Sequence, residues 1–497
     1  MSVARLFELE IVELLYMAAA LAFVLGLKRL GRVRTARSGN ALASTGMLIA
    51  VAATMFLVFG AASLPLVVGG LVLGGAAGAV LARRVPMTSM PELVALFNGL
   101  GGAASMLVAL AEVARFTRAL STGVTSDRAT GVASEPVRAT LAEGVGVLGG
   151  VPFAVAVVVS VLIGAVTLSG SLVAWGKLSG RIKQDRVGLL GSKPVNGLLL
   201  AVALGLAALA GFGVSAGWSI GVVSLCLVVA ALALGVGLVL PIGGADMPVV
   251  ISLLNAYSGV AAAATGFVLE NNLLIVAGSL VGASGLILTQ IMCRAMNRSL
   301  GNVLFAGYAA SAPGTDEGYT GVKSTTAEEL AMLLDSAQSV IIVPGYGLAV
   351  AQAQHKVREL AALLEKRGTD VRYAIHPVAG RMPGHMNVLL AEADVPYEQL
   401  FELDQINGEF ARTDVVLVLG ANDVCNPAAI DDPKSPIAGM PVLQVWEART
   451  VVVVKRSLSA GYAGIKNPLF ERDNTLMLFA DAKAALEATV TELKSGA

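Results

Sequence analysis

The sequence has few charged residues, few aromatic residues and few cysteines. Of its 497 residues, 14% are charged and 5% are aromatic, whereas 56% are hydrophobic. An average soluble domain has about 25% charged residues, so this composition argues against an ordinary soluble enzyme. The three cysteines, Cys226, Cys293 and Cys425, stand singly, without CxxC or other metal-type spacing. The sequence therefore predicts neither a disulfide framework nor a zinc site, and we assign no metal ligands.

The formal net charge is zero, but charge is unevenly distributed along the chain. Residues 1–300 contain 19 Lys and Arg against 11 Asp and Glu, whereas residues 301–497 contain 16 against 24. This difference predicts a membrane domain followed by an acidic soluble domain. Neither part has the dense basic patch that nucleic-acid binding requires. We therefore expect the lipid bilayer as a partner, and no nucleic acid.

Nine apolar runs follow one another in the first part, each about as long as the roughly 20 residues that a helix needs to cross a bilayer. They span residues 11–27, 43–62, 64–82, 91–112, 151–175, 196–214, 219–240, 247–269 and 272–293. We expect a polytopic α-helical membrane domain over residues 1–300, with its two ends on opposite sides. In the third run, Gly70, Gly74 and Gly78 form a small-residue face, which ordinary close packing of helices explains.

Basic residues indicate which loops are cytoplasmic, because such loops carry an excess of Lys and Arg. Clusters of these residues follow the first, third, fifth and ninth runs. The opposite loops have basic residues only between positions 113 and 150, where acids are interleaved with them. The pattern predicts an external N-terminus, a retained first helix and a cytoplasmic C-terminal domain.

Three polar residues, Asn98, Asp246 and Asn255, lie within or at the start of these apolar runs. A polar side chain at membrane depth is costly, and it is a functional candidate by default. For the two asparagines the alternative is hydrogen bonding between packed helices. For Asp246 it is capping of a helix that begins at Met247 and Pro248.

The second part of the chain begins with a stretch that differs in composition from the apolar runs. Residues 301–325 are rich in Gly, Ala, Ser, Pro and Thr without periodicity, which is typical of a linker. Beyond it, the apolar run Ser339 to Val343 precedes a helical pattern that extends to about Arg367. Further strands are expected at 371–375, 399–403, 414–419, 441–445 and 450–454. This alternation predicts βαβ units and an α/β, Rossmann-like, doubly wound parallel sheet over residues 326–497.

The first expected strand ends at a glycine turn, Gly345-x-Gly347, that opens the helical pattern. In dinucleotide sites such glycines permit a tight turn and a close approach of the backbone to a pyrophosphate. Val350 occupies the third glycine position, so the motif alone is weak. Its place between a strand and a helix supports a dinucleotide site.

The ends of two other strands indicate which dinucleotide fits. The second strand ends at His376, without the acidic residue that hydrogen-bonds a ribose 2′-hydroxyl in an NAD site. The strand at 451–454 ends in Lys455, Arg456 and Ser457, two cations and a hydroxyl that suit a phosphate. A solvated strand end is the alternative for this cluster. The missing acid favours NADP over NAD.

Long motifs in both parts of the chain carry a family resemblance. They are Pro344 to Gln354, His376 to Asn387, Gly420 to Asp423, Lys455 to Ser457 with Gly461 to Gly464, Met90 to Leu93 and Gly243 to Asn255. In sequence and order these motifs resemble the beta-subunit family of proton-translocating NAD(P) transhydrogenases. The likeness runs almost from end to end.

The resemblance implies that the soluble domain binds NADP(H), in an orientation reversed relative to ordinary Rossmann enzymes. Arg381 would lie near the phosphates, Asp423 near the nicotinamide end, and Tyr462 in a closing lid. Lys455, Arg456 and Ser457 would hold the 2′-phosphate. The implied nucleotide-side residues are Gly345, Tyr346, Gly347, Val350, Val378, Ala379, Gly380, Arg381, Met382, Pro383, Gly420, Ala421, Asn422, Asp423, Val424, Gly439, Met440, Lys455, Arg456, Ser457, Tyr462, Asp481 and Ala482.

In the membrane part, the resemblance places Asn98, Asp246 and Asn255 at positions tied to proton transfer or its coupling. Some family members have a histidine where this chain has Asn98. An amide cannot bind and release a proton near pH 7 as imidazole can. A proton relay would then need water, another side chain or a histidine from a partner subunit.

The activity that the resemblance implies is hydride exchange between NAD(H) and NADP(H), coupled to inward proton movement in a bacterial inner membrane. An alpha subunit would carry the NAD(H) site, and the family arrangement is a dimer of such heteromers. Two rivals from other classes remain: a transporter whose soluble domain only senses NADP(H), and a membrane-anchored dehydrogenase with a small-molecule substrate. A pure anchor would not need nine helices or amides in their middles.

Overall fold

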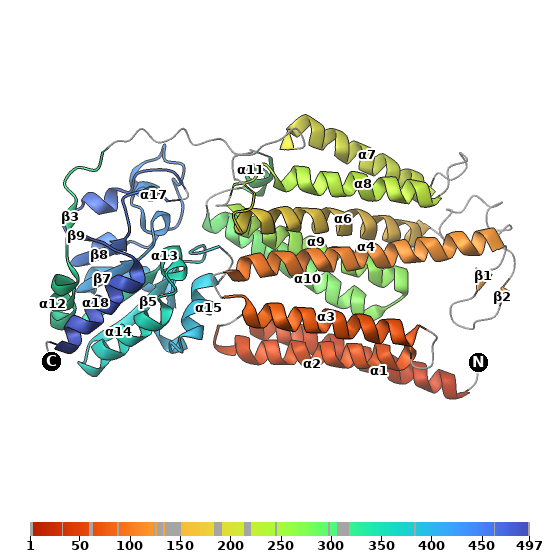
Figure 1. The fold of residues 1–497 in the computed structure, drawn as a ribbon, viewed down its shortest axis with the longest axis horizontal. Coiled ribbons are helices and arrows are strands. Elements are labelled where there is room, and N and C mark those ends of the chain that lie inside the picture. The colour runs from red at the N-terminus through yellow and green to blue at the C-terminus, as the bar shows by residue number, and fades with distance from the viewer. Residues whose placement is uncertain are drawn as a thin grey trace. The chain divides into compact units, whose positions relative to one another are not determined.

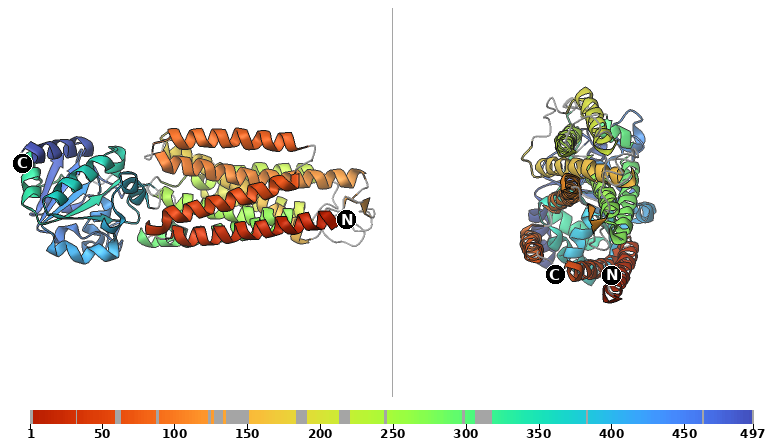
Figure 2. Two further views of the ribbon diagram at one scale, coloured as in Figure 1. Left: turned by 90° about the horizontal axis from the view of Figure 1, so that it is seen from below. Right: turned by 90° about the vertical axis from the view of Figure 1, so that its right-hand side faces the viewer.

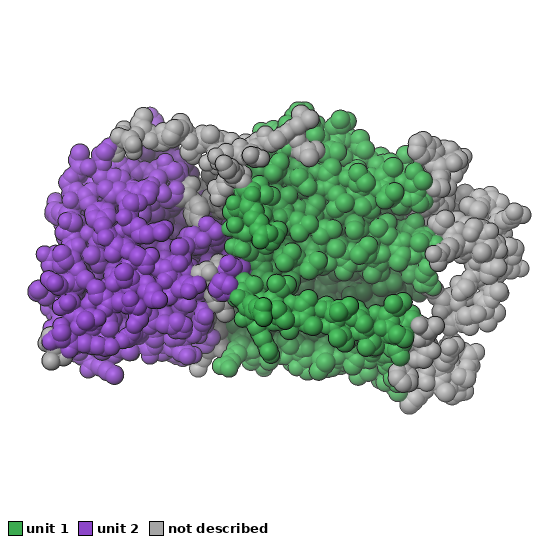
Figure 3. Space-filling view, viewed as in Figure 1, with its two compact units in different colours: residues 1–85, 92–242, 250–288 green, residues 86–91, 243–249, 289–497 purple. Residues whose placement is uncertain are grey.

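The computed structural model describes residues 3–31, 33–58, 63–86, 89–122, 125–126, 133–134, 151–182, 191–212, 220–243, 246–296, 299–305, 318–381, 384–461 and 463–495. These residues form two compact units (Figure 3). The first comprises Met1–Val85, Glu92–Ile242 and Val250–Leu288, and the second comprises Pro86–Pro91, Gly243–Val249 and Thr289–Ala497.

Among the described residues, nine helices are long and apolar enough to cross a membrane. Figures 1 and 2 show them as long helices that run lengthwise beside one another. They are α1 Val3–Leu30, α2 Val33–Val58, α3 Leu64–Arg84, α4 Met90–Thr122, α6 Val151–Leu178, α7 Lys193–Phe212, α8 Ile220–Val239, α9 Met247–Leu269 and α10 Asn272–Ala295. Each of the nine apolar runs is confirmed as a helix over its described residues; positions 59–62, 213–214 and 219 of the expected runs lie outside them. The length and composition of the helices indicate a multi-pass membrane protein.

Glycines bring the backbones of several of these helices together. A Cβ on Gly102 of α4 would lie 2.7 Å from the carbonyl oxygen of Gly164 in α6. A Cβ on Gly259 of α9 would lie 2.3 Å from the backbone nitrogen of Gly282 in α10. Such contacts gain van der Waals energy that larger side chains would prevent, which is how small residues stabilise helix pairs in lipid.

The glycine stripe of α3 behaves differently. Ideal Cβ atoms on Gly70, Gly74 and Gly78 meet no atom within 4 Å, and no residue of α3 is buried. The prediction that this stripe packs inside the bundle is therefore wrong for the described residues of this chain. Four-residue spacing places the glycines on one face, but it does not specify a neighbouring helix.

The second unit contains a parallel sheet of seven strands in the order β3-β9-β8-β7-β4-β5-β6. The strands are β3 Lys323–Ser324, β4 Ser339–Pro344, β5 Asp370–Ile375, β6 Leu400–Glu402, β7 Val415–Leu419, β8 Thr450–Lys455 and β9 Thr475–Phe479. With β4 as the first strand, β4 to β9 follow the doubly wound order 3-2-1-4-5-6 of dinucleotide-binding domains. The predicted parallel α/β sheet is confirmed.

Alternate residues of the central strands contribute to two hydrophobic cores, because successive side chains point to opposite faces of a sheet. Val340 and Ile342 of β4 pack with α12 Ala327–Ser336, α13 Tyr346–Val350, α14 Gln354–Lys366, α15 His385–Glu392 and α18 Ala482–Ser495. Ile341 and Val343 pack against the opposite layer, which includes α16 Leu403–Ile406, α17 Ala428–Asp431 and the segment around Leu443. Both faces are covered, which explains why the strands are almost continuously apolar.

Two local expectations are wrong. Residues 441–445 do not form a strand, because the backbone nitrogen of Leu443 donates to Val424 O (2.9 Å) in the loop after β7 instead of joining the sheet. The helix expected to extend to Arg367 is interrupted after Val350, where Gln352 has a left-handed φ of 49°. In addition, β3 lies within the range expected as linker, and β9 was not anticipated.

Candidate functional site

Two glycine turns meet at the carboxyl ends of neighbouring strands. β4 ends before Gly345 and β7 ends before Gly420, and these two strands are paired at the point where the strand order reverses. Gly345 N donates to Leu419 O and Gly347 N donates to Gly420 O, each over 2.9 Å. In open α/β sheets this switch point opens a crevice in which ligands bind.

The turns tolerate no side chains. A Cβ on Gly345 would lie 2.4 Å from Ala421 N, and one on Gly347 would lie 2.6 Å from Gly420 Cα. Gly420 also has a φ of +65°, which an L-residue with a side chain adopts only with strain. The two turns can approach this closely only because glycine occupies these positions.

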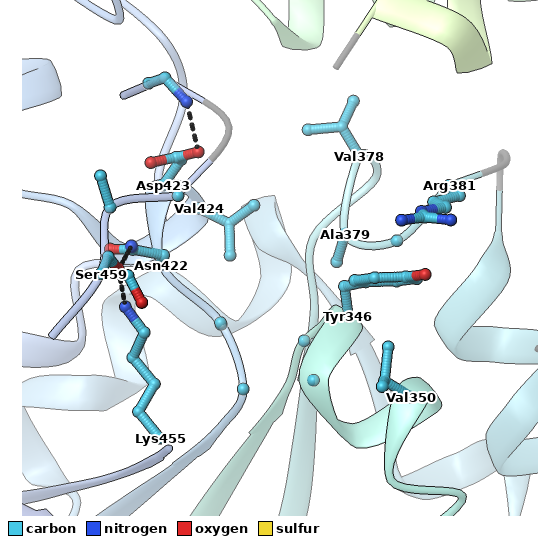
Figure 4. A pocket seen from close by; sticks show the side chains of 18 of the residues that line it. Tyr346, Val350, Val378, Ala379, Arg381, Asn422, Asp423, Val424, Lys455 and Ser459 are labelled. Carbon is cyan, nitrogen blue, oxygen red and sulfur yellow. Dashed lines mark hydrogen bonds between the residues drawn. The ribbon is translucent and has the colours of Figure 1, made fainter. Parts of the chain in front are cut away.

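A pocket lies over these turns (Figure 4). One wall carries Tyr346, Val350, Val378, Ala379 and Arg381, and the other carries Asn422, Asp423, Val424, Lys455 and Ser459. The remaining lining residues of the sheet domain are Gly345, Gly347, Gly380, Gly420, Ala421, Pro436, Ile437, Met440, Val454, Arg456, Ser457, Ala460, Gly461, Ala463, Ala480, Asp481 and Ala482.

His385 supports the pocket wall that carries Arg381. The Arg381 guanidinium carbon lies 4.3 Å from the centre of the Tyr346 ring, a cation–π arrangement. The backbone nitrogen of Arg381 donates to His385 Nδ1 over 3.1 Å. Burial lowers the pKa of His385 to about 4, and the nearby Arg381 charge acts in the same direction. His385 is therefore a neutral acceptor that orients the loop carrying Arg381.

The opposite wall gathers polar groups at the end of β8. Lys455 Nζ donates to Ser459 O over 2.6 Å, and Asp423 Oδ2 accepts from Ala463 N over 3.0 Å. Burial lowers the pKa of Lys455, although the negative charge of Asp423 opposes the shift. Arg456 and Ser457 are exposed. This wall therefore presents cationic and hydroxyl groups on a loop that its own hydrogen bonds hold together.

The end of β5 presents a neutral imidazole. His376 Nε2 donates to Pro441 O (2.8 Å), and His376 Nδ1 accepts from Val378 N (3.2 Å). Burial lowers the pKa of His376 to about 4, although the hydrogen bond to Pro441 O opposes the shift. Both ring nitrogens are engaged, and this strand end has no acidic residue to bind a ribose hydroxyl.

Most of the nucleotide-side residues expected from the sequence line this single pocket. Gly439 does not; it lines a second hollow with Met440, beside Leu403 and Asn407. Met382, Pro383 and Tyr462 lie outside the described residues. Pro436, Ile437 and Ala480 were missed because they belong to no motif. Ser459, Ala460 and Gly461 follow Ser457 after the single residue Leu458, so closeness in sequence was an available signal for them.

In the first unit, Asn98 joins three helices. Its Nδ2 donates to Ser171 Oγ of α6 over 3.0 Å. Its Oδ1 accepts from Ser258 Oγ of α9 over 2.7 Å. Close packing of Gly99, whose Cβ would lie 3.1 Å from Ser171 Cβ, brings α4 and α6 near enough for this contact.

The other two polar candidates are not part of this contact. Asn255 lies one turn before Ser258, but its side chain is exposed and makes no hydrogen bond to the described residues. Asp246 is buried directly ahead of α9, and its backbone nitrogen donates to Gly243 O over 3.2 Å. The sequence predicts both Asn255 and Asp246 as candidates, but the first is exposed and the second is buried.

Comparison with known proteins places the chain in a family. The family model for the NAD(P) transhydrogenase beta subunit matches residues 12–492. The chain belongs to the NAD(P) transhydrogenase beta-subunit family. It is 47% identical over 484 residues to the NAD(P) transhydrogenase subunit beta of Rhodospirillum rubrum, covering 96% of this chain and 97% of that relative. The same values hold for the protein of that name in Rhodospirillum rubrum strain ATCC 11170.

Membership of the NAD(P) transhydrogenase beta-subunit family has two direct consequences. This is an oxidoreductase family, so nicotinamide nucleotides are the relevant class of ligand. A beta subunit also implies an alpha subunit as its partner. Both consequences agree with a chain that combines apolar helices with a doubly wound sheet.

Proposed function

We propose that the pocket over the Gly345 and Gly420 turns binds NADP(H). The observation that carries this proposal is the position of Lys455, Arg456 and Ser457 at the carboxyl end of β8, on the wall of a pocket built at the switch point. The backbone approach at Gly345 and Gly347 suits a pyrophosphate, and the two cations suit a 2′-phosphate. The residues present therefore fit the dinucleotide.

The same residues support a reversed orientation of the dinucleotide. In an ordinary Rossmann site, the group that recognises the adenosine ribose follows the second strand, which corresponds to β5 here. β5 ends in the neutral His376, whereas the cations follow β8, on the other side of the switch point. The 2′-phosphate half of the nucleotide is then on the β8 side, and Arg381 is beside its phosphates on the facing wall.

In this proposal NADP(H), when bound, supplies the hydride chemistry, in exchange with NAD(H) held by the alpha subunit. The described residues bind, orient and exclude water, and none is required as a nucleophile. Asp423 holds Ala463 through the hydrogen bond from Ala463 N. The Arg381 and Lys455 walls hold opposite sides of the ligand.

We further propose that hydride exchange is coupled to proton translocation through Asn98, Asp246 and Asn255. The Asn98 amide cannot titrate near pH 7, so it would orient water or a titrating group from elsewhere. Coupling would arise because proton binding and the NADP redox state each favour one state of the same protein. The arrangement proposed is a dimer of heteromers in a bacterial inner membrane, with the N-terminus outside and the NADP(H) domain in the cytoplasm.

One reconstitution experiment tests this function. The chain and its alpha subunit are placed in vesicles, and reduction of an NADP analogue by NADH is followed together with the internal pH. We expect hydride transfer accompanied by proton movement. Transfer without proton movement would remove the coupling, and binding of NADPH without any transfer would favour a nucleotide-sensing transporter.

The nucleotide assignment has its own test in the same complex. Lys455→Ala and Arg456→Ala should each weaken NADPH binding about tenfold to a hundredfold, because each removes a charge-assisted hydrogen bond. NADH binding to the alpha subunit should not change. Arg449→Ala is the matched control, since Arg449 directly precedes the opposite end of β8 and pairs with Asp414 over 3.0 Å. Equal losses for all three variants would contradict the 2′-phosphate assignment.

A further inference from the structure

The first described residues after position 317 are anchored to one short segment of the sheet domain. The backbone nitrogen of Asn467 donates to Tyr319 Oη over 3.0 Å. The Tyr319 ring lies 5.7 Å from that of Phe470, and Lys466 Nζ lies 5.1 Å from the Tyr319 ring centre. Tyr319 thus contacts three residues of the segment 466–471, which we call the bridge segment.

A second anchor lies beside the first. Thr320 N donates to Glu471 Oε1 over 2.6 Å, and the same carboxylate pairs with Lys466 Nζ at 2.9 Å. The two ends of the bridge segment are therefore tied to consecutive residues of the incoming chain. Because residues 318–322 are the covalent continuation of the membrane helices, the bridge segment holds the point at which the chain enters the sheet domain.

The bridge segment also touches the nucleotide pocket. Asn467 is fully buried, and its Nδ2 donates to Asn422 O over 3.1 Å while its Oδ1 accepts from Leu469 N over 3.0 Å. With the Asn422 amide oriented so that its oxygen accepts from Lys455 Nζ over 3.1 Å, the amide nitrogen faces Asn467, and the backbone carbonyl of Asn422 is the acceptor for Asn467 Nδ2. Lys455 Nζ also lies 5.0 Å from the Phe470 ring centre.

A second buried amide extends this connection. Asn426 is fully buried in the loop after β7, and its Nδ2 donates to Lys466 O over 3.2 Å. The bridge segment is thus hydrogen-bonded to the loop after β7 at both Asn422 and Asn426. Buried polar groups are stable only when they are satisfied, and a satisfied network fixes one arrangement where apolar packing allows several.

We propose that Tyr319 and Asn467 are positioning residues for the NADP(H) pocket. Through Asn422 they fix the position of the Lys455 ammonium relative to residues 318–322, where the chain enters the sheet domain. This rests on the proposed function of the pocket. Neither residue lines the pocket, so each acts through Asn422 and Lys455. Loosening the contact should accelerate release of the nucleotide without altering the residues that face it.

The test uses the full complex of this chain with its alpha subunit, and NADPH as the probe. Tyr319→Phe removes only the hydroxyl that accepts from Asn467 N and leaves the ring contacts with Phe470 and Lys466. Asn467→Asp keeps the acceptor for Leu469 N but removes the donor to Asn422 O. NADPH dissociation, followed by its fluorescence, should accelerate about tenfold in each variant, because one buried hydrogen bond is lost.

Tyr373→Phe is the matched control. Tyr373 is a fully buried tyrosine of β5 whose hydroxyl has no hydrogen-bond partner among the described residues. Its replacement should leave NADPH dissociation within about twofold of the original rate. If Tyr319→Phe behaves like Tyr373→Phe, the positioning role is wrong.

A double-mutant cycle separates positioning from a general loss of stability. In a Lys455→Ala background the effect of Tyr319→Phe on NADPH release should shrink, because the group being positioned is gone. Additive effects would mean that Tyr319 only stabilises the fold and would overturn the proposal. If the unchanged complex binds no NADPH at all, the proposed function fails instead, and the two failures are distinguishable.

Discussion

The hydroxyl of Ser258 donates to Asn98 Oδ1 over 2.7 Å, which joins α9 to α4. The other end of the Asn98 amide donates to Ser171 of α6. The amide is thus fixed in one orientation, with its oxygen toward α9 and its nitrogen toward α6. An amide held in this way can orient a neighbouring water but cannot carry the proton itself.

Ser258→Ala should impair proton coupling because it leaves Asn98 Oδ1 without its donor. We expect the coupled rate in vesicles to fall about tenfold, the effect of losing one partly buried hydrogen bond. Hydride exchange in detergent, where no gradient forms, should change less. Ser284→Ala is the control, since within the described part of the chain the Ser284 side chain bonds only to Val281 O of its own helix α10. A coupled rate unaffected by Ser258→Ala would make the Asn98 contact one of packing alone.

Patterns with a strong local cause were readable in the sequence. Runs of about 20 apolar residues form helices in this chain, because a helix satisfies the backbone groups of its own segment in lipid. The glycines at Gly345 and Gly347 predicted a tight turn between a strand and a helix, because glycine permits such a turn at little cost. Lys455 and Arg456 were identifiable because they directly follow a buried strand.

Features that depend on distant neighbours could not be read in this way. Nothing local reveals that Tyr319 would contact Asn467, 148 residues away, or that β3 would pair with β9. The apolar segment at Leu443 has the composition of a strand, but its backbone bonds to a loop. The stripe of Gly74 and its neighbours has the spacing of a packing face, yet no described residue packs there.

Gly420→Ala should disrupt the pocket at the glycine turns over which it lies. The positive φ alone costs an L-residue about 1–2 kcal/mol, and the added Cβ would lie 2.3 Å from Gly347 Cα. We expect both a lower melting temperature of the solubilised complex and a loss of NADPH binding. Gly408→Ala is the matched control, because a Cβ there meets no atom within 4 Å and its φ is not positive. Similar melting temperatures for both variants would contradict the close-approach argument.

The stability of the sheet domain should fall in acid through His376. Its pKa in the fold is about 4, below the 6.5 of a free imidazole, so the unfolded chain binds the proton first. The contribution is therefore complete above about pH 6.5 and is lost as the pH falls toward about 4, for a total of about 3 kcal/mol.

His376→Gln, which can still donate to Pro441 O, should flatten the decline of melting temperature between those pH values. His355→Gln, on the exposed face of α14, is the control and should keep the slope of the original chain. Because burial also lowers the pKa of His385 to about 4, some decline should remain in His376→Gln, but identical slopes for the two variants would show that His376 does not contribute.

Lys177 secures the end of a membrane helix. Its side chain is buried in α6, and its ammonium donates to Leu240 O and Ile242 O, the carbonyls just beyond the end of α8. A positive charge at this end also complements the helix dipole. The next described element after these carbonyls is the start of α9, which Asp246 precedes.

Lys177→Met keeps the apolar stem but removes the ammonium, so the buried carbonyl of Ile242 and the partly buried carbonyl of Leu240 lose their donor. Each unsatisfied group costs about 1–3 kcal/mol, and we expect a clear drop in the melting temperature of the detergent-solubilised complex. Lys193→Met removes an exposed lysine at the start of α7 and should change the melting temperature little. Leu240 and Ile242 shortly precede Asp246, a proposed coupling residue, in the sequence. Lys177→Met should therefore also slow proton-coupled turnover. Unchanged melting and turnover would mean that water replaces the ammonium at the end of α8.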